Sequence, residues 1–402
     1  MKILRRFGFA AALVVVVLAA YQQVNLVRAA GGPAPAAHGP YRVLAPIESG
    51  NLLLFPVVRD TGKSIGEPPF ITLDEGIRAG DVEVTEAGNV RGLVRHRGPV
   101  PSTNFSRGDE VNTLVLVNHS SKPLLLLAGE IVTGGKQDRV IAKDRIVPVG
   151  ADPIDLSVFC IEPGRWTESS ATFGAAAKAP SNGFMVQPAV RERAMVEKDQ
   201  QQVWDSVHGA ISSMAMAAAP PASAASHSES YGDVASSRAL GTTSYAKVMQ
   251  SSAISEKVDE AAAPVMKSRD QVLAQLREQH AVGVVVAVRG EIVWADLFAD
   301  TELLSRYWTK LVRSYAAESL TAGETHAAPS INDAQHFLDA PAGGTETTEG
   351  DVGVYRYREL KSGATETFVL ESLLPGTGYD VHVSKMQLIN PERRIKPYPI
   401  VR

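Results

Sequence analysis

"AVGVVVAVRGEIVWADLFADTELLSRYWTKLVRSYAAES", residues 281–319, is the stretch that decides the fold. Its first eight residues are small or β-branched and apolar, which predicts a strand, and Arg289-Gly290 predicts a tight turn into a second strand over 291–298. Asp300 then serves as the N-cap of a long helix. That helix carries large apolar side chains at helical spacing: Leu304, Trp308, Leu311 and Tyr315. A hairpin running into a helix indicates a sheet with helices packed on it.

The N-terminal half, residues 41–166, consists of short strand-like runs bounded by Gly, Pro, Asn or Asp. They are "NLLLFPVV", "VEVTEAG", "NTLVLVNHS", "PLLLLAGEIV", "RIVPV" and "IDLSVFCIE". Several runs are apolar throughout, which predicts strands covered on both faces. Further strands follow residue 350. Because strands and helices are segregated, the expected fold is α+β, with a mixed or antiparallel sheet core and a few packed helices.

Between these halves we expect a helix over 188–210, and then a disordered Ala/Ser/Pro-rich insert over 211–262, which has too few large apolar residues to offset the cost of ordering. Order resumes at Ser268 with a capping box, and residues 321–350 are predicted to be loop. One core is expected over 41–390, because neither half closes alone. A flexible leader over 30–40 and a tail over 391–402 flank it.

The first 29 residues have the order of a secretory signal peptide: basic residues, an apolar run and a small-residue ending. The apolar run from Phe7 to Ala20 is shorter than the ~20 residues that span a bilayer, which favours a cleaved signal over an uncleaved anchor. We therefore expect a periplasmic or extracellular protein with no membrane span after cleavage.

Cleavage would remove four basic residues and no acidic one, leaving 36 basic against 44 acidic residues. Such an acidic chain is a poor partner for nucleic acid. Cys160 is the only cysteine, so an internal disulfide is excluded, and its apolar run predicts a buried, inert thiol. The sequence contains no nucleotide-binding fingerprint and no Cys/His metal spacing, so neither cofactor nor metal is expected.

The most suggestive polar stretch is "GEIVTGGKQDRVIAKDRIVP", residues 129–148. It predicts a hairpin, with strands over 124–132 and 139–148 and with Gly134 and Gly135 supplying positive φ. Consecutive N–H groups of such a turn, next to Lys136, Gln137 and Arg139, could also form an anion-binding nest.

A second polar stretch, "CIEPGRW", ends a predicted buried strand at residues 160–166. The guanidinium of Arg165 suits bidentate capture of an anion and Trp166 offers a stacking surface, while Gly164 belongs to the turn itself. The alternative is a structural lock in which Arg165 pairs with Glu162 or Glu130 under Trp166. If the two stretches met, Glu130 and Glu162 would be the candidates for acid/base work.

Other polar residues are expected to be structural. His119 and His382 stand isolated, and Asp296 is expected to be a polar residue at a strand end.

Four segments together resemble the ARG and Rhodanese-Phosphatase-superfamily-associated Protein domain family: "LLLLAGEIVTGGKQDRV", "FCIEPGRW", "QQVWDSV" and the stretch ending in "SYAAES". The resemblance runs from about Tyr41 to Gln387. The family name associates it with ADP-ribosylglycohydrolase and rhodanese-phosphatase contexts, which implies ADP-ribose, nucleotide or phosphate-related ligands. The residues that match its motifs are Gly129, Glu130, Gly135, Lys136, Gln137, Arg139, Glu162, Gly164, Arg165 and Trp166.

Three functions remain open. The first is an envelope module that binds an anionic small molecule or an acidic group of a partner protein at the Gly-Gly-Lys-Gln and Pro-Gly-Arg-Trp turns. The second is a structural or protein-interaction domain without a ligand site. The third is a hydrolase with Glu130 or Glu162 as general base, against which stands the lack of a nucleophile, metal set or cofactor motif, so the balance is against an enzyme.

Overall fold

The computed structural model describes residues 41–59, 69–86, 113–165, 167–175, 184–218, 241–266, 269–321 and 324–388. The expected signal peptide over 1–29, the leader, the tail and Trp166 lie outside these residues.

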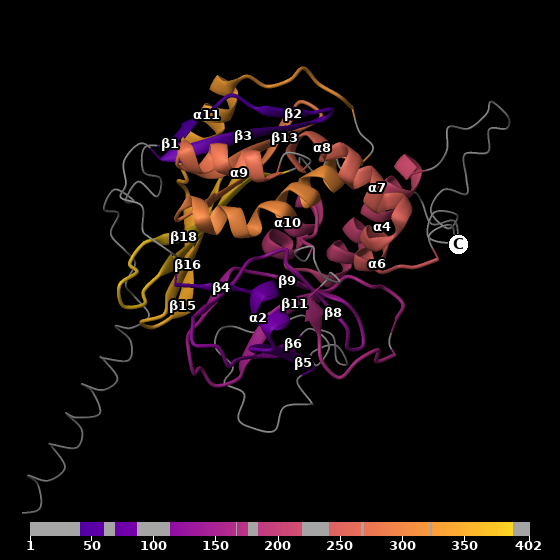
Figure 1. Ribbon diagram of the computed structural model, residues 1–402, viewed down its shortest axis with the longest axis vertical. Coiled ribbons are helices and arrows are strands. Elements are labelled where there is room, and N and C mark those ends of the chain that lie inside the picture. The colour runs from indigo at the N-terminus through magenta and orange to yellow at the C-terminus, as the bar shows by residue number, and fades with distance from the viewer. Residues whose placement is uncertain are drawn as a thin grey trace, which may run out of the picture. The chain divides into compact units, whose positions relative to one another are not determined.

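The largest sheet is antiparallel throughout and has the strand order β1-β3-β13-β14-β18-β17-β16-β15, with β2 paired to β3 (Figure 1). The predicted hairpin forms its centre. These strands are β1 (Tyr41–Val43), β2 (Ile47–Ser49), β3 (Leu52–Arg59), β13 (Ala281–Val288), β14 (Glu291–Phe298), β15 (Thr345–Asp351), β16 (Tyr355–Ser362), β17 (Thr365–Ser372) and β18 (Asp380–Gln387).

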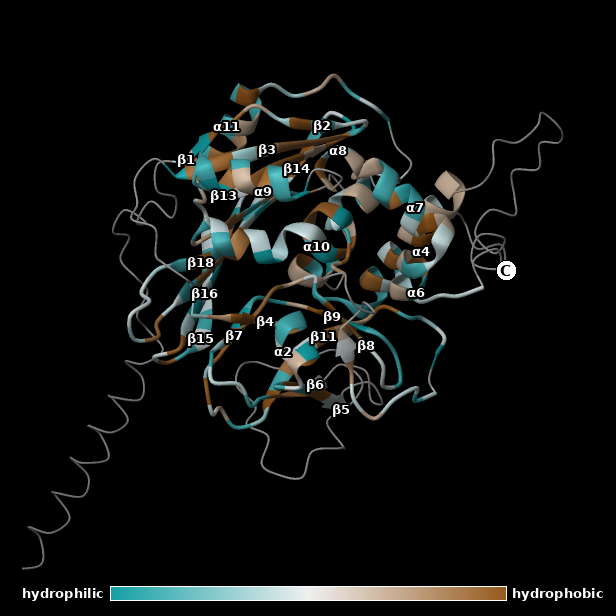
Figure 2. Cartoon of the chain, in the orientation of Figure 1, coloured by the Kyte–Doolittle hydropathy of each residue, from teal (hydrophilic) through white to brown (hydrophobic). Residues whose placement is uncertain are grey.

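Both faces of the central strands β3 and β13 are covered, which explains their unbroken apolar runs. In β3, Leu52 and Leu54 pack into the cluster that includes helix α10 (Thr301–Ser319), whereas Leu53 and Phe55 pack into the cluster that includes helix α11 (Ile331–Asp339). Figure 2 shows β3 as a hydrophobic band. The prediction of strands covered on both faces is confirmed for β3.

The remaining strands form a three-stranded sheet, β10-β7-β4, and a six-stranded sheet, β12-β8-β9-β11-β6-β5. The pair β4/β7 is parallel and the other pairs are antiparallel, so the α+β class with mixed and antiparallel sheets is confirmed. The strands are β4 (Ile71–Thr72), β5 (Val82–Glu86), β6 (Thr113–Asn118), β7 (Leu124–Leu126), β8 (Ile131–Thr133), β9 (Arg139–Ile141), β10 (Arg145–Val147), β11 (Ile154–Cys160) and β12 (Gly174–Ala175).

The hairpin predicted over 124–148 has the expected turn, but its two strands are not continuous. Each of its two expected strands breaks in the middle, so that β7 pairs with β10 in one sheet while β8 pairs with β9 in another. The breaks are the loops 127–130 and 142–144. Each loop carries a buried carboxylate that pairs with a residue from another part of the chain: Glu130 with Lys310 and Asp144 with His382.

The helical regions also differ from expectation in three places. The helix expected over 188–210 is divided into α3 (Pro188–Glu192), a π-helical turn η2 (Arg193–Glu197) and α4 (Gln200–Ala218). Lys198, at the break, has a left-handed backbone with φ of 53°.

The insert expected over 211–262 contains the end of α4 and the helices α6 (Tyr245–Gln250) and α7 (Ser252–Ala261), while residues 219–240 lie outside the described ranges. These helices form because a few apolar side chains, such as Val248 and Ile254, reach the main core. Two further short helices follow, α8 (Ala263–Met266) and α9 (Arg269–Glu278).

The third difference from expectation is that the segment 321–350, expected to be loop, contains α11 and most of β15. A capping box of Ser330 and Asp333 starts α11, and Phe337 and Leu338 form its short buried stripe. Strand β15 has no apolar face to reveal it in the sequence, and its pairing with β16 makes it a strand. Within the described residues, no helix is both long enough and apolar enough to cross a bilayer.

Helix α10 is buried along nearly its whole length. Its apolar side chains pack on the large sheet, and on another side the Tyr307 hydroxyl donates to the carbonyl of Leu125 in β7. Lys310 is 1% exposed, and its Nζ lies 2.5 Å from Asp74 Oδ2 and 2.6 Å from Glu130 Oε1. Asp74 belongs to helix α2 (Leu73–Ala79). One buried ammonium therefore joins α10 to α2 and to the loop 127–130.

Replacing Lys310 by Met should destabilise the protein by about 3–5 kcal/mol, because two buried carboxylates would lose their cation. Urea unfolding of the two proteins measures the difference. Lys257→Met is the matched control: Lys257 pairs with Glu260 on the surface, where side-chain exposures are 44% and 71%. That change should cost less than about 1 kcal/mol. Equal effects of the two substitutions would contradict the assigned role of Lys310.

Candidate functional site

The two polar turns meet in space. Arg165, which follows β11, reaches the turn between β8 and β9: its Nη1 donates to the carbonyl of Gly135 at 2.8 Å and its Nη2 to that of Gly134 at 3.3 Å. The same Nη2 lies 2.6 Å from Glu162 Oε2. We call the residues 134–139, 162–165, Glu86, Ser244 and Lys247 the turn cluster.

The N–H groups that were predicted to form an anion-binding nest donate to four separate acceptors of the chain itself. The donors and acceptors are Gly134 N to Asp138 Oδ1 (3.1 Å), Gly135 N to Ser170 Oγ (3.3 Å), Lys136 N to Glu86 Oε1 (3.0 Å) and Asp138 N to Glu162 Oε2 (3.2 Å). Three of the four acceptors are carboxylates. An external anion would have to displace them to use these N–H groups.

The glycines are needed for this geometry. Gly135 has a φ of 50°, and a Cβ at this position would lie 2.2 Å from the ring of Phe173 and 2.6 Å from Glu86 Oε1. Any other residue would therefore push Glu86 away from the turn. Gly164 has a φ of 94° in the second turn.

Glu162 is an ionised, fully engaged carboxylate. Burial alone would raise its pKa, but hydrogen bonds from Arg165 and from the Asp138 N–H lower the pKa below its usual value. Lys247 Nζ lies 3.2 Å from its other oxygen. A carboxylate with a lowered pKa and three partners is poorly suited to act as a general base.

Glu130 lies in a different cluster from Glu162. Its Oε2 accepts the N–H of Leu127 at 2.8 Å and its Oε1 binds Lys310, and burial raises its pKa. None of these partners belongs to the turn cluster. The structure therefore does not bring the two candidate acid/base residues onto one set of partners.

Gln137 differs from the carboxylates of the turn cluster, and it shares with Arg165 Nε the lack of a partner among the described residues. Its side chain is fully buried, yet neither its amide nitrogen nor its amide oxygen has a hydrogen-bond partner among the described residues. Its backbone carbonyl accepts a hydrogen bond of 2.5 Å from Arg139 Nη1, so the buried guanidinium lies against this residue. The hydroxyl of Thr85, next to Glu86 in β5, also lacks a partner within the described ranges. A buried amide left in this way normally has a bound water, ion or ligand beside it.

The charges of the turn cluster do not cancel. Four basic side chains stand against three carboxylates, which leaves one positive charge: the basic residues are Lys136, Arg139, Arg165 and Lys247, and the acids are Glu86, Asp138 and Glu162. Lys136 is exposed, and Lys247 is 58% exposed at its side chain. The excess charge favours one additional anion.

A second polar cluster is fully buried, and the sequence reasoning missed it. Arg191 Nη1 lies 2.9 Å from Asp296 Oδ2, and its Nη2 donates to Ser384 Oγ at 2.9 Å. His382 Nδ1 lies 2.6 Å from Asp144 Oδ2, and its Nε2 lies 3.2 Å from Asp296 Oδ1. The Tyr315 hydroxyl donates to Asp296 Oδ2. Asp296 is thus the hub of an ion network inside the sheet and its covering helices, rather than a polar residue at a strand end.

The only signal of this network in the sequence is a register. Asp296 of β14 pairs with Ser384 of β18, and His382 lies two positions from Ser384 on the same face. Arg191 is far away along the chain, so no local pattern links it to them. Burial alone would lower the pKa of His382, but Asp144 and Asp296 raise this pKa to about 8.

Cys160 is buried, as expected, and burial raises the pKa of its thiol to about 11. Such a thiol is inert at neutral pH. No group of His, Cys, Asp and Glu side chains in the described part of the chain has an arrangement that could hold a metal ion.

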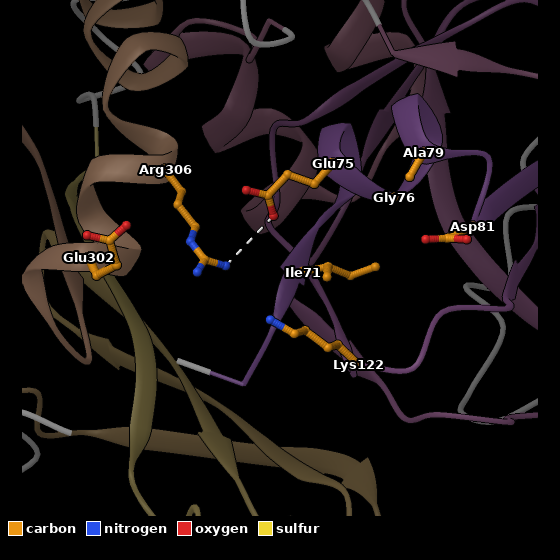
Figure 3. Close-up of a pocket in the computed structure, with 8 residues that line it drawn as sticks. All are labelled: Ile71, Glu75, Gly76, Ala79, Asp81, Lys122, Glu302 and Arg306. Carbon is orange, nitrogen blue, oxygen red and sulfur yellow. Dashed lines mark ion pairs between the residues drawn. The ribbon is translucent and has the colours of Figure 1, made fainter. Parts of the chain in front are cut away.

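A pocket of about 450 Å³ lies between α2 and α10 (Figure 3). Its lining is Ile71, Glu75, Gly76, Ala79, Asp81, Lys122, Glu302 and Arg306. Arg306 and Glu75 face each other across it at 3.8 Å. Glu75 also accepts the N–H of Thr72 as part of the α2 capping box. None of the predicted site residues lines this pocket.

The chain belongs to the ARG and Rhodanese-Phosphatase-superfamily-associated Protein domain family, ARPP-1, whose model matches residues 40–386. The resemblance drawn from the residues is therefore confirmed. No curated protein and no solved structure shows a significant match to the chain.

Arg165→Ala should destabilise the protein by about 2–3 kcal/mol, because the buried Glu162 carboxylate and two turn carbonyls would lose a charged donor. Lys136 follows Gly135, whose carbonyl Arg165 binds, but its own side chain is exposed. Lys136→Ala should therefore change stability by less than about 0.5 kcal/mol. Chemical denaturation of both variants measures the contrast. An Arg165→Ala protein as stable as the parent would show that the two turns do not depend on this guanidinium.

The contribution of His382 to stability should fall as the pH rises from about 6.5 to above 8. The pKa of His382 is about 8 in the folded protein against an ordinary value of 6.5, so the folded state holds a proton that the unfolded state releases. The stabilisation, about 2 kcal/mol, is complete below pH 6.5 and is lost as the pH passes 8. Urea unfolding at a series of pH values measures the slope, and His382→Gln should flatten it.

The control for this slope is Glu366→Gln. Burial and its neighbour Glu359 raise the pKa of Glu366 to about 7, so this carboxyl also loses stability as the pH rises. Below about pH 7.5, the slope that remains in Glu366→Gln belongs to His382. As the pH approaches 8, Lys385 adds a slope of opposite sign, because burial lowers its pKa to about 8. If that variant shows no slope, the assignment to His382 is wrong.

Proposed function

We propose that this chain is an exported envelope domain that binds an anionic small molecule at the turn cluster, and that it does so without catalysing a reaction. The observation that carries the proposal is the amide of Gln137, which is fully buried and has no partner for either polar atom among the described residues.

Leaving such an amide unsatisfied costs about 1–3 kcal/mol for each polar group. A Leu at position 137 would fill similar space without this cost. A ligand that accepts from the amide nitrogen and lies near the Arg139 guanidinium would recover it. The one excess positive charge of the turn cluster favours a ligand with a negative charge.

The complete burial of Gln137 favours a small ligand over an acidic side chain of a partner protein, since the amide is closed off from the surface. The N–H groups of the turn are already bonded, which also limits where a ligand can bind. The ligand would use the Gln137 side chain rather than the turn N–H groups, which already bind Glu86, Asp138 and Glu162.

Several observations favour binding over hydrolysis. Glu162 is held by Arg165, Lys247 and a backbone N–H, Glu130 neutralises Lys310, and the Cys160 thiol is buried. A general base must be positioned to take a proton from the substrate, whereas Glu162 and Glu130 are each held as the counter-charge of a basic side chain.

The second candidate is a structural domain whose two turns form a lock. The contacts of Arg165 favour it, because both terminal nitrogens of the guanidinium already bind Gly134, Gly135, Thr167 and Glu162. The two candidates differ in what they require of Gln137. A lock has no use for its amide, whereas a ligand site does.

Gln137→Leu should leave the ligand-free protein as stable as the parent or more stable by about 1–2 kcal/mol, and should abolish ligand binding. Thermal unfolding of residues 30–402 with phosphate, sugar phosphates, ADP-ribose, nucleotides and acidic peptidoglycan fragments detects binding. A ligand at about 100 times its Kd adds about 2.7 kcal/mol of stability.

The matched control is Gln200→Leu. Gln200 is a buried glutamine whose amide is satisfied, since it accepts the Cys160 N–H and donates to the Cys160 carbonyl, both at 2.9 Å. Its replacement should destabilise the protein. If no compound of the panel stabilises the parent and Gln137→Leu is more stable, the lock is the better description.

A further inference from the structure

The two outer edges of the large sheet are treated differently. At one edge, strand β1 has only three residues, and the side chain of Gln335 from α11 covers it. The Gln335 amide accepts the N–H of Val43 at 2.8 Å and donates to the carbonyl of Tyr41 at 3.0 Å. These are backbone groups that an added strand would bind, so β1 is blocked.

At the other edge, strand β15 pairs with β16 through all seven of its residues and with no other described strand (Figure 1). Five of the seven residues are exposed and the other two are half-buried. Every second residue of such a strand directs its N–H and C=O away from its partner. The outer side of β15 therefore presents a row of backbone donors and acceptors.

The composition of β15, "TETTEGD", suits pairing with a further strand. It is rich in Thr, which favours extended backbone, and it lacks the Pro and Lys that commonly protect edges. Its charged residues are all acidic: Glu346, Glu349 and Asp351. Lys143 binds Glu349, which shows that a lysine can reach this strand.

The basic residues of the neighbouring β16 do not neutralise β15. Arg356 pairs with Glu371 and Arg358 with Asp380, both away from the edge. Lys361 pairs with Glu366. The outer edge of the sheet is therefore acidic. The backbone groups of β15 that face outward and its acidic side chains lie on the same strand.

We propose that β15 is a docking edge for an extended segment of a partner protein that carries Lys or Arg at alternate positions. The segment would add to the sheet through main-chain hydrogen bonds, and a basic side chain would face Glu346, since Lys143 already binds Glu349. This surface is separate from the turn cluster, so the two proposals stand or fall independently.

The test uses two labelled peptides of equal length, one alternating Lys with Thr and the other alternating Glu with Thr. Fluorescence anisotropy with residues 30–402 should show binding of the Lys peptide, weaker binding at high salt, and no binding of the Glu peptide. Protection of β15 amides against hydrogen exchange should rise with the Lys peptide. Glu346→Lys should weaken binding severalfold without altering the fold.

Thr347→Pro and Thr348→Pro form an internal control. Neighbouring residues of a strand direct their N–H groups to opposite sides, so one proline removes a bond to β16 and the other removes only an outward donor. The variant that keeps parental stability should lose the peptide. The proposal is overturned if both peptides bind alike or neither binds. It is also overturned if β15 pairs with a second copy, seen as a concentration-dependent dimer that this proline abolishes.

Discussion

Lys310 is the constraint on which the arrangement of the chain depends. Helix α10 is covered on nearly all sides, so the charged residues along it must find their partners inside the protein. Three of its basic residues, at relative positions 0, 4 and 7, do so on separate segments: Arg306 with Glu75, Lys310 with Asp74 and Glu130, and Arg313 with Asp259. Only the middle pair is sealed from water. It is therefore the one whose loss the fold tolerates least.

The broken hairpin over 124–148 follows from the same requirement. Two uninterrupted strands would place Glu130 and Asp144 in ordinary ladder positions. By breaking at 127–130 and 142–144, the chain instead delivers Glu130 to Lys310 and Asp144 to His382. Gly129 permits the first break: its φ is 91°, and a Cβ there would lie 2.9 Å from Arg191 Cδ. The glycine thus serves the approach of a buried arginine rather than a ligand.

The sequence predicts correctly those elements whose apolar pattern and capping residues lie within one short stretch of the chain. Strands β13 and β14 and helix α10 match the residues expected from apolar runs and a capping Asp300. The turn at 134–138 is likewise predicted by its glycines. Strand β15 could not be predicted, because its side chains are polar on both faces and its conformation depends on β16. The network around Asp296 could not be predicted either, since Arg191 and Asp144 come from other regions of the chain.

The candidate site shows the same limit of prediction from local sequence. Glu130, Glu162 and Arg165 are chemically versatile residues, and sequence reasoning selects them for that versatility, but the fold uses each as a counter-charge or a tie. A residue fully engaged in holding two segments together cannot also bind a ligand without releasing one of them. Function in such a polar interior is therefore to be sought where donors and acceptors are left over. In the turn cluster the amide of Gln137 is such a group, and it costs stability for as long as nothing binds it.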